Sequence, residues 1–258
     1  MSDVVLFEKL DGHVAVVTLN RPEKRNAVNA ALTKGLDAAV KRVEADPDIW
    51  VAILTSSNDR AFCAGADLAE VAKGNHEGLS TEDGGFAGFV NHRRLKPWIA
   101  APKGATVAGG LELCLACDMM VAAETCTFGL SEAKRGLVAA AGGATRLAKR
   151  IPLGIAMEMI TTGETIDAQR AYALGLANRV VPAADTLNGA IDLARAITAN
   201  APLAVREAVR LMKQSQTESD EEGHRATEGV RARIMTTDDA KEGVRAFVEK
   251  RQAQWTGR

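Results

Sequence analysis

The sequence predicts an α/β fold followed by a helical C-terminal region. Short apolar segments rich in β-branched residues alternate with amphipathic helical segments through the first part of the chain. The last part shows helical periodicity almost throughout. The composition agrees with this fold class, because 258 residues with 47% hydrophobic and 25% charged side chains are ordinary for a globular protein with one continuous core.

The expected elements follow in chain order. Apolar, β-branched runs predict strands at 13–19, 49–55, 98–101 and 119–122. Helical periodicity predicts helices at 28–44, 167–174, 185–199, 202–214 and 239–251, with breaks at Gly175 and Pro182. Segment 71–90 is rich in glycine and polar residues, which predicts a mobile loop. Periodicity alone does not distinguish a doubly wound sheet from other α/β arrangements.

Glu112 lies in an apolar helical segment directly after the glycine pair Gly109-Gly110. If the helix begins near Ala108 or Gly109, its free N–H groups and positive dipole end can face an acyl oxygen. Glu112 then lies about one turn further in. The helix dipole alone also favours a glutamate at such a position, so Glu112 has an equally good structural explanation.

Glu132 follows a second apolar, strand-like run at 128–131, and it can form an acid/base pair with Glu112. A turn of small residues at 60–68 follows the strand expected at 49–55 and can offer a further backbone N–H. Two carboxylates beside backbone donors are the groups that addition or removal of water requires. The combination is more informative than any of its parts.

These segments, in this order, resemble the enoyl-CoA hydratase (crotonase) superfamily over nearly the whole chain. The matching stretches are Asn20-Arg21-Pro22 with Asn26-Ala27, residues 61–68, residues 104–118, residues 128–132 with Gly136, Gly142-Gly143, and Arg146-Leu147. The resemblance implies a crotonase-like spiral of ββα turns at 1–195. It also implies a C-terminal helical region at 196–258 that packs on the core and on neighbouring subunits, and so forms a homotrimer, usually paired as a dimer of trimers.

The resemblance also implies roles for the two carboxylates. In that reading the backbone N–H groups of Ala64 and Gly109 polarise the thioester carbonyl of an acyl-CoA. Glu112 is the expected base toward water, and Glu132 is the expected proton donor to Cα. The chain is then a hydro-lyase that adds water to a 2-enoyl-CoA or dehydrates a 3-hydroxyacyl-CoA.

Three alternatives stay open at this stage. Segments 132–136 and 150–163 are also similar to the carnitinyl-CoA dehydratase branch. An enoyl-CoA isomerase needs only one carboxylate. A non-catalytic acyl-CoA-binding protein would keep the pocket alone. Departures from the family pattern at Pro102, Lys103, Ala108, Ser131 and Ala139 bear on efficiency and pocket shape more than on reaction class.

Substrate contacts are expected from the same resemblance. The turn that would hold the adenine contains Ala64, Ala66, Asp67 and Leu68, and Lys24 and Arg25 are expected to contact phosphate. Phe247 and Lys250 are expected to touch the CoA of a neighbouring subunit. Phe86 and Phe89 are candidates for the wall of the acyl pocket, and they are equally well explained as core residues.

Several functional classes are disfavoured by composition. A formal net charge of −1 argues against a nucleic-acid partner. The N-terminus has no signal-peptide pattern and no segment approaches 18 uninterrupted apolar residues, so no membrane span and a cytoplasmic location are expected. The four cysteines lie in apolar segments and are expected to be reduced core thiols, including the Cys114-x-x-Cys117 pair. The four histidines show no metal-ligand spacing, so the expected cofactor is none, apart from coenzyme A as part of the substrate.

Overall fold

A six-stranded sheet forms the centre of the computed structural model, which describes residues 3–258. Its strand order is β1 (Val5–Leu10), β2 (Val14–Leu19), β3 (Val51–Ser56), β7 (Trp98–Ala101), β9 (Met119–Ala123) and β12 (Arg179–Val181). β1 pairs antiparallel with β2, and each of the other pairs is parallel. The strands expected at 13–19, 49–55, 98–101 and 119–122 are β2, β3, β7 and β9.

A second, four-stranded sheet has the order β11 (Ile166–Asp167), β10 (Thr127–Gly129), β8 (Ala105–Val107) and β4 (Ala61–Cys63). Successive turns of the chain place one strand in each sheet and then enter a helix. Thus β3 and β4 lead to α2 (Leu68–Ala72), and β7 and β8 lead to α3 (Gly109–Ala116). This is the predicted spiral of ββα turns, and it is not a doubly wound sheet.

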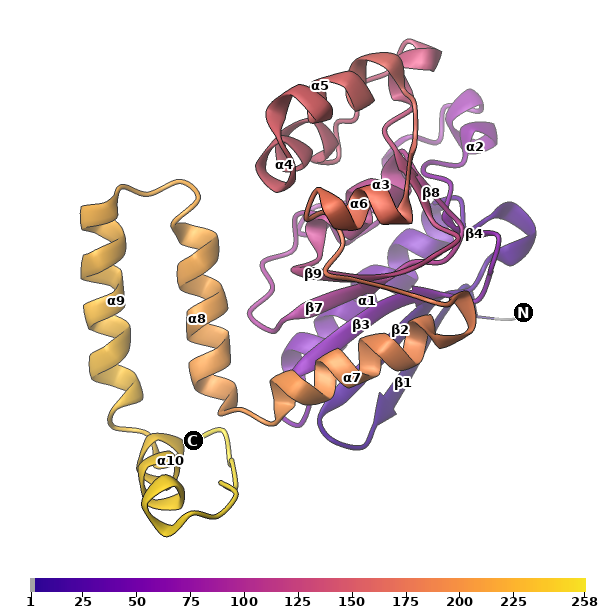
Figure 1. The fold of residues 1–258 in the computed structure, drawn as a ribbon. Coiled ribbons are helices and arrows are strands. Elements are labelled where there is room, and N and C mark those ends of the chain that lie inside the picture. The colour runs from indigo at the N-terminus through magenta and orange to yellow at the C-terminus, as the bar shows by residue number, and fades with distance from the viewer. Residues whose placement is uncertain (1–2) are drawn as a thin grey trace.

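The strands of the large sheet are buried on both faces, which explains their continuous apolar runs. In β3, Val51 and Ile53 pack with α7 (Thr186–Thr198) in one apolar cluster, whereas Ala52 and Leu54 pack in the larger core with α1 (Ala30–Ala45). Figure 1 shows α7 crossing one face of the sheet and α1 lying on the other. The side chain of Asn29 accepts a hydrogen bond from the Leu32 N–H, so α1 begins two residues later than expected.

Segment 71–90, expected as a mobile loop, contains more structure than its composition indicates. A short hairpin joins β5 (Ser80–Thr81) to β6 (Gly85–Phe86), and Ala87, Phe89 and Val90 are buried beyond it. Asp37 of α1 accepts hydrogen bonds from Thr81 Oγ1 at 3.0 Å and pairs with His92 Nε2 at 2.9 Å. These two contacts hold the hairpin and the segment after it against α1.

Three helices follow β10 in the chain, with β11 between the second and the third: α4 (Gly143–Arg150), α5 (Leu153–Thr162) and α6 (Ala168–Ala173). Three more project from the core after α7: α8 (Pro202–Gln214), α9 (Asp220–Ile234) and α10 (Asp238–Glu249) (Figure 1). α7 packs on the sheet and runs to Thr198, so the projecting region begins at the 199–201 turn, a few residues after the predicted boundary at 195/196. No helix in 3–258 has the length and apolar content needed to cross a membrane.

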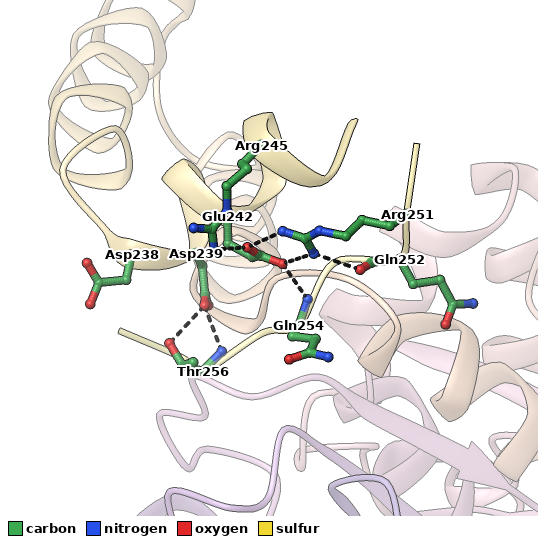
Figure 2. A pocket seen from close by; sticks show the side chains of 8 residues that line it. All are labelled: Asp238, Asp239, Glu242, Arg245, Arg251, Gln252, Gln254 and Thr256. Carbon is green, nitrogen blue, oxygen red and sulfur yellow. Dashed lines mark hydrogen bonds and ion pairs between the residues drawn. The ribbon is translucent and has the colours of Figure 1, made fainter. Parts of the chain in front are cut away.

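The C-terminal tail folds back on α10 (Figure 2). Asp239 accepts hydrogen bonds from the N–H groups of Thr256 at 2.7 Å and Gly257 at 2.9 Å. Glu242 pairs with Arg251 at 2.6 Å and Arg245 at 2.6 Å, and these two guanidinium groups hold the pKa of Glu242 well below its usual range. The tail and α10 therefore form one unit.

Candidate active site

A cavity of about 620 Å³ opens between the N-terminus of α3, the turn after β4, the hairpin at β6 and the segment after β10. It brings together seven of the residues predicted for the site: Arg25, Ala64, Ala66, Leu68, Gly109, Glu112 and Glu132. The remaining lining residues are Phe86, Val107, Ala108, Ser131, Arg135, Leu137, Val138, Ala140 and Ala141. The wall is thus mostly apolar, with two acids and two arginines.

Glu112 occupies the first turn of α3, a helix buried on nearly every side. Its side chain is 3% exposed, and its Oε1 accepts a hydrogen bond from the Gly143 N–H at 2.8 Å. Burial, together with a smaller effect of the nearby Glu132 charge, raises the pKa of Glu112 to about 7. The Gly143 and Ala141 amides and the Arg146 charge act in the opposite direction. A carboxyl group with this pKa can both give and take a proton near neutral pH.

Glu132 begins a 3₁₀ turn, Glu132–Arg135, directly after β10. Its Oε2 is buried and has no hydrogen-bond partner within the described part of the chain. Burial raises the pKa of Glu132, while its own backbone N–H and the Arg135 charge oppose that rise. A buried oxygen without a donor is uncommon in folded proteins and is a feature of functional sites.

The backbone donors at the entrance of α3 depend on close backbone packing. A Cβ on Gly110 would lie 2.0 Å from the Cys63 carbonyl oxygen, and a Cβ on Gly65 would lie 3.0 Å from the Gly109 nitrogen. Only glycine allows the turn after β4 and the helix N-terminus to approach this closely. Ala108, immediately before the helix, adopts φ +50° and ψ −128°, a conformation that side-chain-bearing residues rarely take.

The predicted oxyanion role of the Ala64 N–H is contradicted by the structure, because that N–H donates to the Arg25 carbonyl at 3.1 Å. Ala66 is placed differently. It forms an isolated parallel bridge with Val28, in which the flanking Gly65 carbonyl and Asp67 N–H make the hydrogen bonds. The Ala66 N–H therefore points away from Val28, and within 3–258 it donates to no backbone carbonyl.

Several predicted contact residues lie outside this cavity. The Asp67 carboxylate pairs with Arg21 Nη1 at 2.8 Å and accepts from the Ala69 N–H at the start of α2, so it is engaged in the fold. Lys24 lies on the exposed surface. Phe247 and Lys250 lie at the end of the projecting α10, and the Phe247 side chain is 82% exposed.

The two phenylalanines of the hairpin segment have different roles. Phe86 lines the cavity, and its ring is so close to Gly109 that a Cβ there would lie 2.6 Å from Cε1. Phe89 is fully buried and packs edge-on against Trp98 at a centroid distance of 5.1 Å. Phe86 is a wall residue, and Phe89 belongs to the core.

Sequence reasoning assigned no role to segment 137–143, which closes one side of the cavity and hydrogen-bonds Glu112 through Gly143. Leu137 and Val138 are exposed apolar residues at its edge, with exposed fractions of 50% and 73%. Leu137 and Val138, two adjacent apolar residues in a segment without a predicted strand or helix, were the available sequence signal.

The cysteines and acidic clusters of the described residues belong to the core and to structural contacts. All four cysteines are free and buried, and burial raises the pKa of Cys63, Cys117 and Cys126 to about 12. Within residues 3–258, the histidine, cysteine and acidic side chains form no group of three or more suited to a metal ion. A second cavity of about 580 Å³ lies between α10 and the tail. Of its acidic residues, Asp239 and Glu242 are engaged in the contacts of Figure 2, and Asp238 pairs with Lys241.

Comparison with known proteins gives a consistent match. The family model described as enoyl-CoA hydratase/isomerase matches residues 9–258. The enoyl-CoA hydratase EchA19 of Mycobacterium tuberculosis is 39% identical over 96% of this chain and 94% of its own length. The carnitinyl-CoA dehydratase of Proteus mirabilis is 40% identical over 96% of both chains. A crystal structure of an enoyl-CoA hydratase from Mycobacterium tuberculosis superposes with a TM-score of 0.95, at 43% identity, with both chains fully covered.

Proposed function

The chain belongs to the enoyl-CoA hydratase/isomerase family, and on that premise we propose that it is a hydro-lyase that adds water to a 2-enoyl-CoA or dehydrates a 3-hydroxyacyl-CoA. The observation that carries the proposal is the presence of two glutamates in one mostly apolar cavity beside the N-terminus of α3. Glu112 is buried, and Glu132 is half-buried with its Oε2 buried. Both have a raised pKa because of burial. Acid and base chemistry near neutral pH needs such groups.

The thioester carbonyl oxygen would lie between the backbone N–H groups of Ala66 and Gly109. Gly109 opens α3, so its N–H has no partner within the helix. Negative charge develops on this oxygen when the substrate becomes enolate-like, and fixed donors stabilise that charge more than they stabilise the substrate. Removal of one such donor typically costs about 2.7 to 4 kcal/mol of transition-state stabilisation.

The two glutamates would act on water and on Cα. Ionised Glu112 takes a proton from a water molecule, whose oxygen then bonds to Cβ. Protonated Glu132 gives its proton to Cα, so the addition is balanced, with one water consumed and the two carboxyl groups having exchanged charge. Because the groups interact, their proton affinities belong to the pair.

Substrate binding follows from the walls of the cavity. Arg25 lines the cavity and Lys24 lies beside Arg25 in sequence, and these two cations would meet the phosphates of CoA. Ala64, Ala66 and Leu68 form the side where the adenine would lie. Coenzyme A enters as part of the substrate, and the mechanism needs no other cofactor.

A carnitinyl-CoA dehydratase activity is the second candidate, because a relative of that name is 40% identical. The same two glutamates would serve it. Two arginines, Arg25 and Arg135, line the cavity. Arg25 is assigned to the phosphates of CoA and Arg135 lies near Glu132, so turnover of crotonyl-CoA and of carnitinyl-CoA, measured side by side, decides between the two substrates. An isomerase would need only one of the two glutamates, and product analysis with a 3-enoyl-CoA separates it from a hydratase.

The proposed assembly of this chain is a homotrimer, paired into a dimer of trimers. Val244, Phe247 and Val248 recur at helical spacing on α10, and each is at least 65% exposed in the single chain. An apolar helix face of this kind is expected to pack on another subunit, which would bring Phe247 and Lys250 toward a neighbouring CoA. Replacing Phe247 with aspartate should shift the protein toward monomers in analytical ultracentrifugation, and an unchanged sedimentation coefficient would contradict this arrangement.

Turnover of crotonyl-CoA tests the proposed activity directly. The purified protein is followed by loss of the 2-enoyl thioester absorbance, beside Glu112→Gln and Glu132→Gln. Each variant should lose about 100- to 10,000-fold in kcat, the usual contribution of a positioned acid or base. Glu158→Gln, at an exposed glutamate of α5 outside the cavity, is the matched control. Turnover that survives in both cavity variants would overturn the proposal.

A further inference from the structure

Arg146 of α4 connects the loop before α4, which lines the cavity, to the segment that follows β6. Its Nη1 donates to the Ala141 carbonyl at 2.9 Å, and its Nη2 donates to the Val90 carbonyl at 2.7 Å. Gly142, at φ +103°, wraps closely around the guanidinium, and a Cβ there would lie 2.0 Å from Nη1. The loop before α4 therefore packs closely against the Arg146 side chain.

Both of the connected segments reach the reacting groups. The loop side runs from Ala141, which lines the cavity, to Gly143, whose N–H binds Glu112 Oε1 at 2.8 Å. Val90 lies four residues after Phe86, the residue of the β5–β6 hairpin that lines the cavity. A planar guanidinium can hold two carbonyl oxygens in fixed directions, which a lysine ammonium cannot do.

The positive charge of Arg146 also acts on Glu112. Within the described residues, no carboxylate lies within ion-pair distance of Arg146, so its charge is not neutralised by a direct partner. The other charged groups around this pair are Glu132 from the 3₁₀ turn, with Arg135 beside it, and Arg94 and Arg150 next to Arg146. Arg146 favours the ionised form of Glu112, whereas Glu132 disfavours it.

We propose that Arg146 is a positioning residue for Glu112, because it fixes the loop that hydrogen-bonds this carboxylate and places a positive charge near it. This inference rests on the proposed function only for its effect on rate. Arg146 touches no reacting atom, and it acts through the Gly143 amide and through its charge. Arg150, one turn further along α4, serves as a comparison, since it donates to the Cys117 and Asp118 carbonyls at the far end of α3.

The test combines a direct titration of Glu112 with kinetics. Carboxyl-¹³C-labelled glutamate allows the Glu112 resonance to be followed by NMR against pH, and Glu112→Gln assigns it. Arg146→Met should move the titration midpoint up by about one pH unit and lower kcat for crotonyl-CoA at pH 7 by about 10-fold or more. Arg146→Lys should restore most of the midpoint and only part of the rate, and Arg150→Met should leave both near wild type.

The outcomes separate this inference from the proposed function. If the Glu112 midpoint is the same in wild type and Arg146→Met, the inference is overturned, even where kcat falls, since the fall would then reflect the fold alone. Equal effects of Arg146→Met and Arg150→Met would also overturn it. A wild-type protein without turnover would remove the proposed hydratase activity, and the NMR titration would still decide the role of Arg146. Circular dichroism of each variant, with Arg146→Gln as a second neutral replacement, confirms that folded protein is compared.

Discussion

Replacing Glu112 with glutamine is expected to stabilise the folded protein at alkaline pH while it removes activity. The folded-state pKa of Glu112 is raised by burial to about 7, above its ordinary value of 4.5. Between these two values the unfolded chain releases a proton that the folded chain retains. The wild-type protein therefore loses stability as pH rises through this window, and the loss stays constant above it. Glutamine cannot ionise and escapes this loss.

The size of the effect follows from the two pKa values. At pH 5 the carboxyl is still mostly protonated in the folded protein, and its burial costs about 1 kcal/mol relative to an unperturbed glutamate. At pH 8.5 the cost reaches about 3 kcal/mol. The Oε1 of glutamine can still accept the bond from the Gly143 N–H. The gain in stability from Glu112→Gln should thus be about 2 kcal/mol larger at pH 8.5 than at pH 5.

Urea unfolding at pH 5 and pH 8.5 measures this difference. Wild type, Glu112→Gln and the exposed control Glu158→Gln are compared at equal protein concentration, because subunit association would otherwise change the apparent stability. The control should show no pH-dependent gain. A free-energy difference between wild type and Glu112→Gln that is the same at both pH values would refute the reasoning, since Glu112 would then titrate normally in the folded protein.

Three further changes test the geometry of the cavity. Ala108→Gly should raise the free energy of unfolding by about 1 kcal/mol in urea titrations, because glycine adopts the positive φ of this position without strain; a loss of stability would contradict this account. Gly110→Ala should prevent stable folding or destabilise by more than about 3 kcal/mol, because its Cβ would lie 2.0 Å from the Cys63 carbonyl; a normal thermal midpoint would count against the close packing described. Phe86→Ala should raise kcat/KM for a six-carbon enoyl-CoA relative to crotonyl-CoA by about 10-fold, because its two extra methylenes are accommodated where the ring was; an unchanged ratio would show that another residue limits the acyl chain.

The elements that the sequence predicted well are those with a clear apolar pattern. β7 at Trp98–Ala101 and α8 at Pro202–Gln214 have the expected bounds, and β2, β3 and β9 differ by one or two residues. Among the elements that were not predicted, two share a reason. β1 is an edge strand with charged residues, and α9 is a polar helix in which only Val230 is buried. Neither has the apolar periodicity on which the prediction depends.

The sequence by itself determined the α/β class, the two glutamates and the glycine pair that opens α3, because these are local patterns of residue type. It could not determine which N–H of the 63–67 turn is free, since that depends on the pairing of Ala66 with Val28 from a distant segment. It also could not show that Arg146 binds the Val90 carbonyl, 56 residues away, or that Phe86 rather than Phe89 faces the cavity. Only the tertiary structure decided these points, because hydrogen-bond direction and burial are properties of segments brought together by the fold.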